Sequence, residues 1–321
     1  MTSSYAILWA LSAGFFFALG DFSLKMALQY SSPTVAINVM VWVQWVIFTV
    51  ICWGSGTFSN FSNPEFTWFL LTGFMNPVLF LFLYTLGIRR VGLVRSAPLK
   101  GFTPIVAVVF AFFVLEERLI AFQYVGIALT IGGIFTITTE DSRREAPVRG
   151  PAASSPGGGE GGAANGPSEE NPTEKSPAYR RLGYLFTILA ATSTGLSAVL
   201  FKIVLLRLPS PLFGAWLGAC LGVVLYPFVA FLFPPGERFG LRRSAWPWLI
   251  CGGASMATAI YSLFAAIHHG MVSIVTTLYQ ISPLIVLALA VLFLRKLERV
   301  TPRVVAGGLM TVGGGVLVSV F

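Results

Sequence analysis

Apolar residues occupy most of the chain in long runs that are separated by short polar stretches. Each run is about 20 residues long, enough for a helix to cross a hydrocarbon core roughly 30 Å thick. The runs lack the period-2 alternation of membrane strands, and a segment in lipid must satisfy its backbone hydrogen bonds internally. We therefore predict an all-α integral membrane protein with ten transmembrane helices, at residues 6–28, 35–54, 66–88, 95–115, 119–138, 183–206, 211–233, 246–267, 272–294 and 303–321.

Residues 140–180 interrupt this pattern with a stretch of Gly, Ser, Pro and Glu that contains few apolar residues. Such a composition is typical of a flexible linker. A disordered linker in the middle of a ten-helix chain predicts two five-helix halves, at residues 1–139 and 181–321. Because five is odd, tandem copies must cross the bilayer in opposite senses, as the inverted repeats of many secondary transporters do.

The two halves share features in the same order and at nearly constant spacing, as an internal repeat requires. A lysine lies near the end of the first helix of each half, a Thr/Ser-Pro pair lies in the fourth helix, and glycines recur in the last helix. The matched pairs are Lys25 with Lys202, Pro104 with Pro283, and Gly126 with Gly307.

The sequence TPIVAVVFAFFVLEERL followed by YVGIALTIGG, at residues 103–133, resembles the EamA-domain permeases of the drug/metabolite transporter superfamily. The resemblance covers nearly the whole chain outside the linker. It implies a secondary transporter with a substrate cavity between the halves and alternating access by rocking, and it does not name the substrate. Glu117 matches the glutamate that the family shows at the end of the fourth helix of a repeat. The second half departs from this pattern, with Arg295-Lys296 and then Glu298.

The composition excludes several other classes of protein. The chain is 55% hydrophobic and 11% charged, far from the balance of a soluble domain. The net charge of +8 comes from basic residues spread over many loops, which does not predict binding to nucleic acid. The cysteines, all in apolar runs, do not have the spacing of a disulfide framework or a zinc site: Cys52, Cys220 and Cys251. No catalytic motif is present, so we expect no enzyme activity, no cofactor and no metal.

The loop charges predict an orientation. Apart from the three lysines within the predicted spans there are 18 Lys and Arg, and all except Arg118 and Arg207 lie on the side opposite the termini. The positive-inside rule then places both termini outside and the linker in the cytoplasm. The family resemblance implies cytoplasmic termini instead, and we follow the charge count. We expect a multi-pass protein of the plasma (inner) membrane.

Four charged residues fall inside predicted spans, where a charge costs at least about 2.5 kcal/mol and usually marks a pathway or a partner. Asp21 and Lys25 lie four residues apart, so they share a helix face and can pair. Lys202 has Ala198 where Asp21 would be, and Lys100 lies between Pro98 and Gly101. Cations without a local counter-ion favour an anionic or zwitterionic substrate. The alternative is that the lysines snorkel to the membrane interface.

Polar and aromatic residues in two further helices are candidates for the translocation path. Tyr279 and Gln280 precede Pro283, which can kink a helix and free carbonyl groups for a substrate; the alternative is a kink capped by Ser282 and Thr277 alone. Pro104 is the matching kink in the first half. Asn38 and Trp42 share a helix face with Trp45 and can line a cavity, although packing or interface anchoring accounts for them equally well.

We therefore predict a secondary active transporter for a small anionic or zwitterionic metabolite such as an amino acid. A proton is the expected coupling ion and Asp21 its candidate carrier. The alternative within transport is an exporter of hydrophobic or cationic drugs. A membrane-embedded enzyme and a non-transporting scaffold are the rivals from other classes. The expected partners are a small-molecule substrate, the lipid bilayer and protons; the sequence does not indicate an oligomeric state.

Overall fold

The computed structural model of the chain describes residues 4–27, 29–91, 102–145, 177–231 and 241–282, with scattered residues between 285 and 317. Within these ranges the regular secondary structure is helical, with turns and short irregular connections between the helices and one isolated β-bridge between Ser31 and Leu241. The α-helices are α1 (Ser4–Ala27), α2 (Pro33–Gly54), α3 (Phe66–Gly73), α4 (Phe80–Val91), α6 (Phe102–Val114), α7 (Ala121–Glu145), α8 (Pro177–Arg207), α9 (Pro211–Phe231), α11 (Trp246–His269) and α12 (Val272–Leu278). Short 3₁₀ or π segments are η1 (Thr57–Ser62), η2 (Phe74–Leu79), η5 (Arg243–Ala245) and η6 (Tyr279–Ile281).

Six of the described helical stretches are long and apolar enough to cross a membrane, namely Ser4–Leu24, Val35–Gly54, Phe66–Tyr84, Arg181–Arg207, Pro211–Phe228 and Arg243–His269. Three shorter apolar helices lie at Phe102–Val114, Ala121–Gly133 and Val272–Ile281. The described residues therefore form the helices of a multi-pass membrane protein. The predicted total of ten spans stays a prediction, because the spans 95–115, 272–294 and 303–321 lie partly or mostly outside the described residues.

Two helices extend into the segment 140–180 that the sequence predicts to be a linker. The α7 helix continues to Glu145, and α8 already begins at Pro177. Residues 146–176, between these helices, lie outside the described part of the chain.

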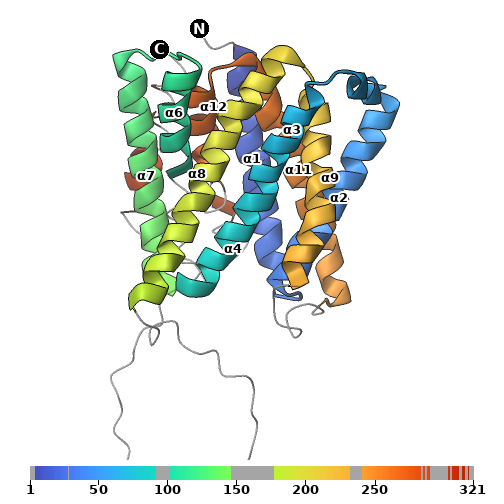
Figure 1. The fold of residues 1–321 in the computed structure, drawn as a ribbon. Helices are drawn as coiled ribbons and strands as arrows, with labels where there is room; N and C mark the ends of the chain where they lie inside the picture. Colours follow the sequence, from blue (N-terminus) through green and yellow to red (C-terminus); the bar gives the residue numbers. More distant parts are fainter. Residues whose placement is uncertain are drawn as a thin grey trace, which may run out of the picture.

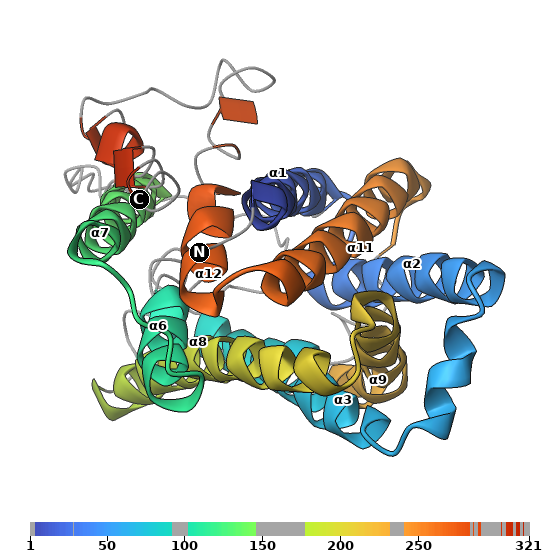
Figure 2. The same cartoon turned by 90° about the horizontal axis from the view of Figure 1, so that it is seen from above.

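The helices are arranged as two units of opposite direction. In Figure 1, α1 starts at the upper edge of the bundle, whereas its repeat equivalent α8 starts at the lower edge and ends at the upper one. Packing partners are exchanged in the same way: α1 packs on α11, and α8 packs on α3 and α4. Likewise α2 packs on α11 and α9 packs on α3, while α2 and α9 contact each other (Figure 2). This exchange is the packing that an inverted repeat produces.

The predicted span 66–88 is a candidate membrane span at Phe66–Tyr84, but its helix is broken in the middle, which the apolar pattern did not predict. Asn76 has extended backbone angles (φ −145°, ψ 113°), and Pro77, inside η2, has no N–H to donate. Two hydroxyls of α8 bond to carbonyls beside the break: Ser193 Oγ donates to the Met75 oxygen at 2.8 Å, and Ser197 Oγ donates to the Thr72 oxygen at 3.3 Å. Polar side chains of a neighbouring helix therefore stabilise the break in the apolar bundle, as lipid cannot.

Small residues allow several helices to approach closely. On α9, glycines at 214, 218 and 222 repeat every four residues and lie close to α8 and α3, to α3 and η2, and to α2 and η2, respectively. A Cβ atom added at Gly73 of α3 would lie 3.0 Å from the Cα atom of Gly218. A Cβ atom added at Gly253 of α11 would lie 2.6 Å from Val43 Cβ of α2. Such small-residue contacts drive helix association where lipid removes the hydrophobic driving force.

Candidate functional site

The α1 helix crosses the end of α12 at a glycine. A Cβ atom added at Gly14 would come within 2.8 Å of the Ile281 side chain and 2.9 Å of the Tyr279 carbonyl oxygen, so this crossing needs a glycine. One turn further along α1, the Phe17 ring packs on the Tyr279 ring with 5.6 Å between centroids. At this point α12 changes from α-helical to 3₁₀ hydrogen bonding in η6, directly before the position of Pro283.

The predicted Asp21–Lys25 pair belongs to the same stripe of α1. Residues four apart share a helix face, so Asp21 lies one turn beyond Phe17, and Lys25 one turn beyond Asp21. Asp21 is half-buried and has at least one interaction partner. The contacts of α1 with η6 described above are at Gly14 and Phe17, so Asp21 and Lys25 lie on the same face of α1, one and two turns beyond the Phe17–Tyr279 contact.

Lys202 has partners that the sequence did not predict. Its ammonium donates to the carbonyl oxygens of Ile267, His268 and Gly270, at 2.7, 3.0 and 3.0 Å. These carbonyls lie at the C-terminal end of α11, where the last turn of a helix leaves carbonyl groups unpaired and carries partial negative charge. An ammonium has three N–H donors, and all three are used. These carbonyls therefore satisfy the ammonium, although α8 has Ala198 and no counter-ion one turn before Lys202.

Glu117 binds the start of the next helix. The Val272 N–H donates to Glu117 Oε1 at 2.7 Å, while the N–H and the hydroxyl of Ser273 donate to Oε2 at 3.0 and 2.7 Å. Glu117 is 8% exposed. A carboxylate at a helix N-terminus satisfies amides that have no partner within the helix and interacts favourably with the positive end of the helix dipole.

Together these two side chains hold the short turn between α11 and α12 from both sides, and we call Lys202 and Glu117 the helix-end clamp. The cation binds the negative end of α11, and the anion binds the positive end of α12. The two charges also interact with each other. Because Glu117 belongs to the first repeat and both other elements belong to the second, the clamp joins the two halves.

A backbone feature after α6 directs Glu117 toward α12. Glu116 has a positive φ of 53°, an uncommon conformation for a residue with a side chain. The Glu117 N–H then turns back to donate to the Ala111 carbonyl at 3.2 Å. The chain therefore reverses sharply at the end of α6, and the Glu117 carboxylate reaches the first turn of α12.

The structure separates the other predicted path residues from the α1–η6 crossing. Asn38 and Trp42 lie on α2, which packs on α11 and α9. The Trp42 ring is 45% exposed and meets the Trp45 ring edge-on, with centroids 5.6 Å apart. Trp45 itself packs against the buried cluster that contains Phe48, which agrees with the packing alternative for that residue.

The other residues predicted to line the path or kink a helix are described only in part. Pro104 is buried in the first described turn of α6, where a missing N–H removes no bond within the described helix. Gln280 is half-buried in η6. Lys100 and Pro283 lie outside the described residues, and of Lys25 only the position on α1 is described.

Two features of the structure were not predicted from the sequence, the break at Asn76 and the partners of Glu117, although the sequence contains a sign of each. The Asn76-Pro77 dipeptide is a turn signal inside an apolar run and marks the break that Ser193 and Ser197 stabilise. Glu117 was singled out by the family pattern, but its partners Val272 and Ser273 are more than 150 residues away in sequence.

Comparisons with known proteins agree with this architecture. The model of the EamA-like transporter family matches the chain twice, at residues 4–139 and 181–320. No curated protein matches the chain in sequence. Among solved structures, one bearing only the description "Crystal structure of protein" superposes with a TM-score of 0.77 over 99% of this chain and 98% of that chain, at 17% identity. At that identity the likeness establishes the fold alone.

Proposed function

Since the chain belongs to the EamA-like transporter family, and with it to the membrane transporters of the drug/metabolite superfamily, we propose that it moves a small zwitterionic or anionic metabolite, such as an amino acid, by alternating access coupled to protons. The observation that carries this proposal is the stripe on α1 formed by Gly14, Phe17, Asp21 and Lys25. This stripe meets the irregular end of α12 at Tyr279.

The chemistry of this region suits a zwitterion. A carboxylate and an ammonium one turn apart can pair with each other, or each can bind the opposite charge of a substrate. Helix interruptions in transporters supply free backbone groups at such sites, and the 3₁₀ segment η6 lies directly against α1. Because Lys202 is fully occupied by carbonyls, the cationic contribution comes from Lys25 and Lys100 in this proposal. With one carboxylate, Asp21, and fewer available lysines, the site favours a zwitterion over a purely anionic substrate.

The first experiment is substrate-induced thermal stabilisation of the purified protein, since a ligand that binds the folded state raises its melting temperature. The panel contains amino acids, organic acids, phosphorylated metabolites and lipophilic cations. We expect stabilisation by a zwitterion or an anion, and its loss in Lys100→Ala. The control Glu65→Gln changes an acidic residue outside this region and should keep the response.

Proteoliposomes test the proton coupling with the substrate so identified. Uptake driven by a pH gradient should be lost in Asp21→Asn, whereas exchange of substrate across the membrane without a gradient should persist. Loss of both activities equally would assign Asp21 to substrate binding and not to proton transfer.

Export of hydrophobic or cationic drugs is the second candidate function. The observation that favours it is the aromatic surface that Phe17 and Tyr279 form beside a carboxylate, because aromatic faces and a carboxylate are sufficient to bind a lipophilic cation. Stabilisation by lipophilic cations that Lys100→Ala leaves unchanged would support this function and refute transport of a zwitterion.

A further inference from the structure

A groove of about 250 Å³ lies between α3 and α8. Its walls are almost entirely apolar, with Trp68, Leu71 and Thr72 from α3 and Leu200 and Ile203 from α8. The one hydroxyl in this set is already used, because Thr72 Oγ1 donates to the Phe69 carbonyl at 2.9 Å. Trp68 and Leu71 are 48% and 38% exposed, so the groove opens on the surface of the bundle.

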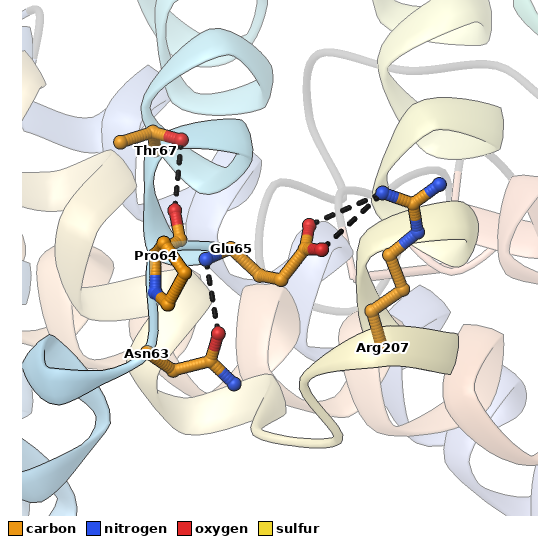
Figure 3. Close-up of polar contacts among 5 residues, drawn as sticks. All are labelled: Asn63, Pro64, Glu65, Thr67 and Arg207. Atoms are coloured by element: carbon orange, nitrogen blue, oxygen red, sulfur yellow. Dashed lines mark hydrogen bonds and ion pairs between the residues drawn. The ribbon is translucent and has the colours of Figure 1, made fainter.

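One end of the groove carries an ion pair. Arg207, the last residue of α8, lines the groove, and its Nη1 donates to both carboxylate oxygens of Glu65 at 3.3 Å (Figure 3). The side chains are 55% and 30% exposed. A guanidinium has five N–H donors, and the bonds to Glu65 use only Nη1. The pair can therefore bind further groups without being broken.

The direction of the groove matches that of a lipid in a bilayer. Leu200 lies seven residues before Arg207 on α8, or about 10 Å along the helix axis at 1.5 Å per residue. The groove thus runs from a charged helix end into an apolar membrane-spanning segment. Trp68 lies near the charged end, in the first turn of α3, and tryptophans are enriched where a membrane meets water.

We propose that this groove binds a bilayer phospholipid that has an ethanolamine headgroup. One acyl chain occupies the groove, the phosphate binds Arg207, and the ammonium binds Glu65. At about 250 Å³ the groove takes a stretch of one acyl chain and not a whole lipid.

Selectivity among lipids arises at the headgroup. An acyl chain gains little by leaving a bilayer that is equally apolar, so the groove fixes position and not lipid type. Glu65 repels a headgroup that is only anionic, and a choline ammonium has no N–H to donate to its carboxylate. Because both charged side chains are partly exposed, we expect a modest preference, about three- to tenfold, for ethanolamine over glycerol and choline headgroups.

The test compares lipids with identical acyl chains. The full-length protein is incubated in detergent with equal amounts of phosphatidylethanolamine, phosphatidylcholine and phosphatidylglycerol, and native mass spectrometry counts each lipid bound. The wild-type protein should retain the ethanolamine lipid in excess. Arg207→Gln should lower retention of all three lipids. Glu65→Gln should reverse the order in favour of phosphatidylglycerol, because it leaves the guanidinium without a carboxylate beside it.

Two further variants make the result decisive. Leu200→Trp fills the groove and should lower retention of every lipid while leaving the charged pair in place. Arg118→Gln is the matched control, since the Arg118 guanidinium lies over the Phe112 ring, 5.2 Å from its centroid, and does not line the groove. Equal retention of the three lipids by the wild-type protein, or an unchanged order in Glu65→Gln, would overturn the proposal. A melting temperature within about 5 °C of wild type verifies that each variant is folded.

Discussion

The helix-end clamp predicts an unusually large cost for removing Glu117. Its carboxylate accepts two backbone N–H groups and one hydroxyl, all within 3.0 Å, and it is 8% exposed. In Glu117→Ala these donors lose their acceptor, and each buried unsatisfied group costs about 1–3 kcal/mol. Ser273 can rotate its hydroxyl to another acceptor, so the two N–H groups dominate. We expect a loss of about 2–4 kcal/mol in the free energy of unfolding.

Glu117→Gln separates charge from shape. The amide keeps one acceptor oxygen but presents its NH₂ group to a donor, so we expect an intermediate loss of about 1–2 kcal/mol. The matched control is Glu65→Gln, which removes the same charge from an exposed ion pair and should cost less than about 1 kcal/mol.

Thermal unfolding in detergent compares the stability of these variants with that of the wild-type protein. At roughly 2–4 °C per kcal/mol, Glu117→Ala should lower the melting temperature by about 5–15 °C and Glu65→Gln by only a few degrees. Lys202→Met should also destabilise, and the double variant Lys202→Met/Glu117→Gln should lose less than the sum of its single variants, because the two charges interact. If Glu117→Gln and Glu65→Gln shift the melting temperature equally, the clamp does not stabilise the fold.

Three further predictions test the packing and the orientation. Ser193→Ala should cost about 1–2 kcal/mol because it removes the donor to the Met75 carbonyl beside the Asn76 break, whereas the adjacent Thr192→Ala, whose hydroxyl bonds within its own helix, should cost less than about 0.5 kcal/mol; thermal unfolding compares the two. Gly253→Ala should cost about 1–3 kcal/mol because its Cβ would clash with Val43, whereas Gly54→Ala, with open space around it, should be neutral or stabilising in the same assay. A protease-sensitive tag on the N-terminus should be cleaved in intact cells if the charge count is right, and protected if the termini are cytoplasmic.

The sequence predicted those parts of the fold that depend on local pattern. The helices α1, α2, α9 and α11 begin and end within a few residues of the predicted spans, since each is one apolar run bounded by polar or turn-forming residues. The break at Asn76 was missed because the surrounding run is as apolar as an intact span. Its stability depends on Ser193 and Ser197, which another helix supplies. A local pattern contains no information about such a neighbour.

In the candidate site, too, the features that follow from local pattern could be predicted, and those that depend on a neighbouring helix could not. The shared face of Asp21 and Lys25 follows from helix periodicity alone. The contact of Tyr279 with Phe17 depends on how two helices cross, which Gly14 permits but does not specify. The partners of Lys202 were missed for a further reason: they are backbone carbonyls of α11, and a main-chain acceptor leaves no mark in the sequence.

The clamp also makes the two repeats chemically unequal. Lys25 and Lys202 occupy equivalent positions on α1 and α8, and the fold treats these helices as counterparts with exchanged packing partners. Glu117 of the first repeat, which binds the start of α12, has the cations Arg295-Lys296 as its counterpart in the second repeat. A helix N-terminus favours an anion and disfavours a cation. At the matching positions the second repeat therefore has cations where the first repeat has the carboxylate of the helix-end clamp. This difference supports a division of roles in which Lys202 stabilises the joint between the halves, while Lys25 remains with Asp21 at the proposed substrate site.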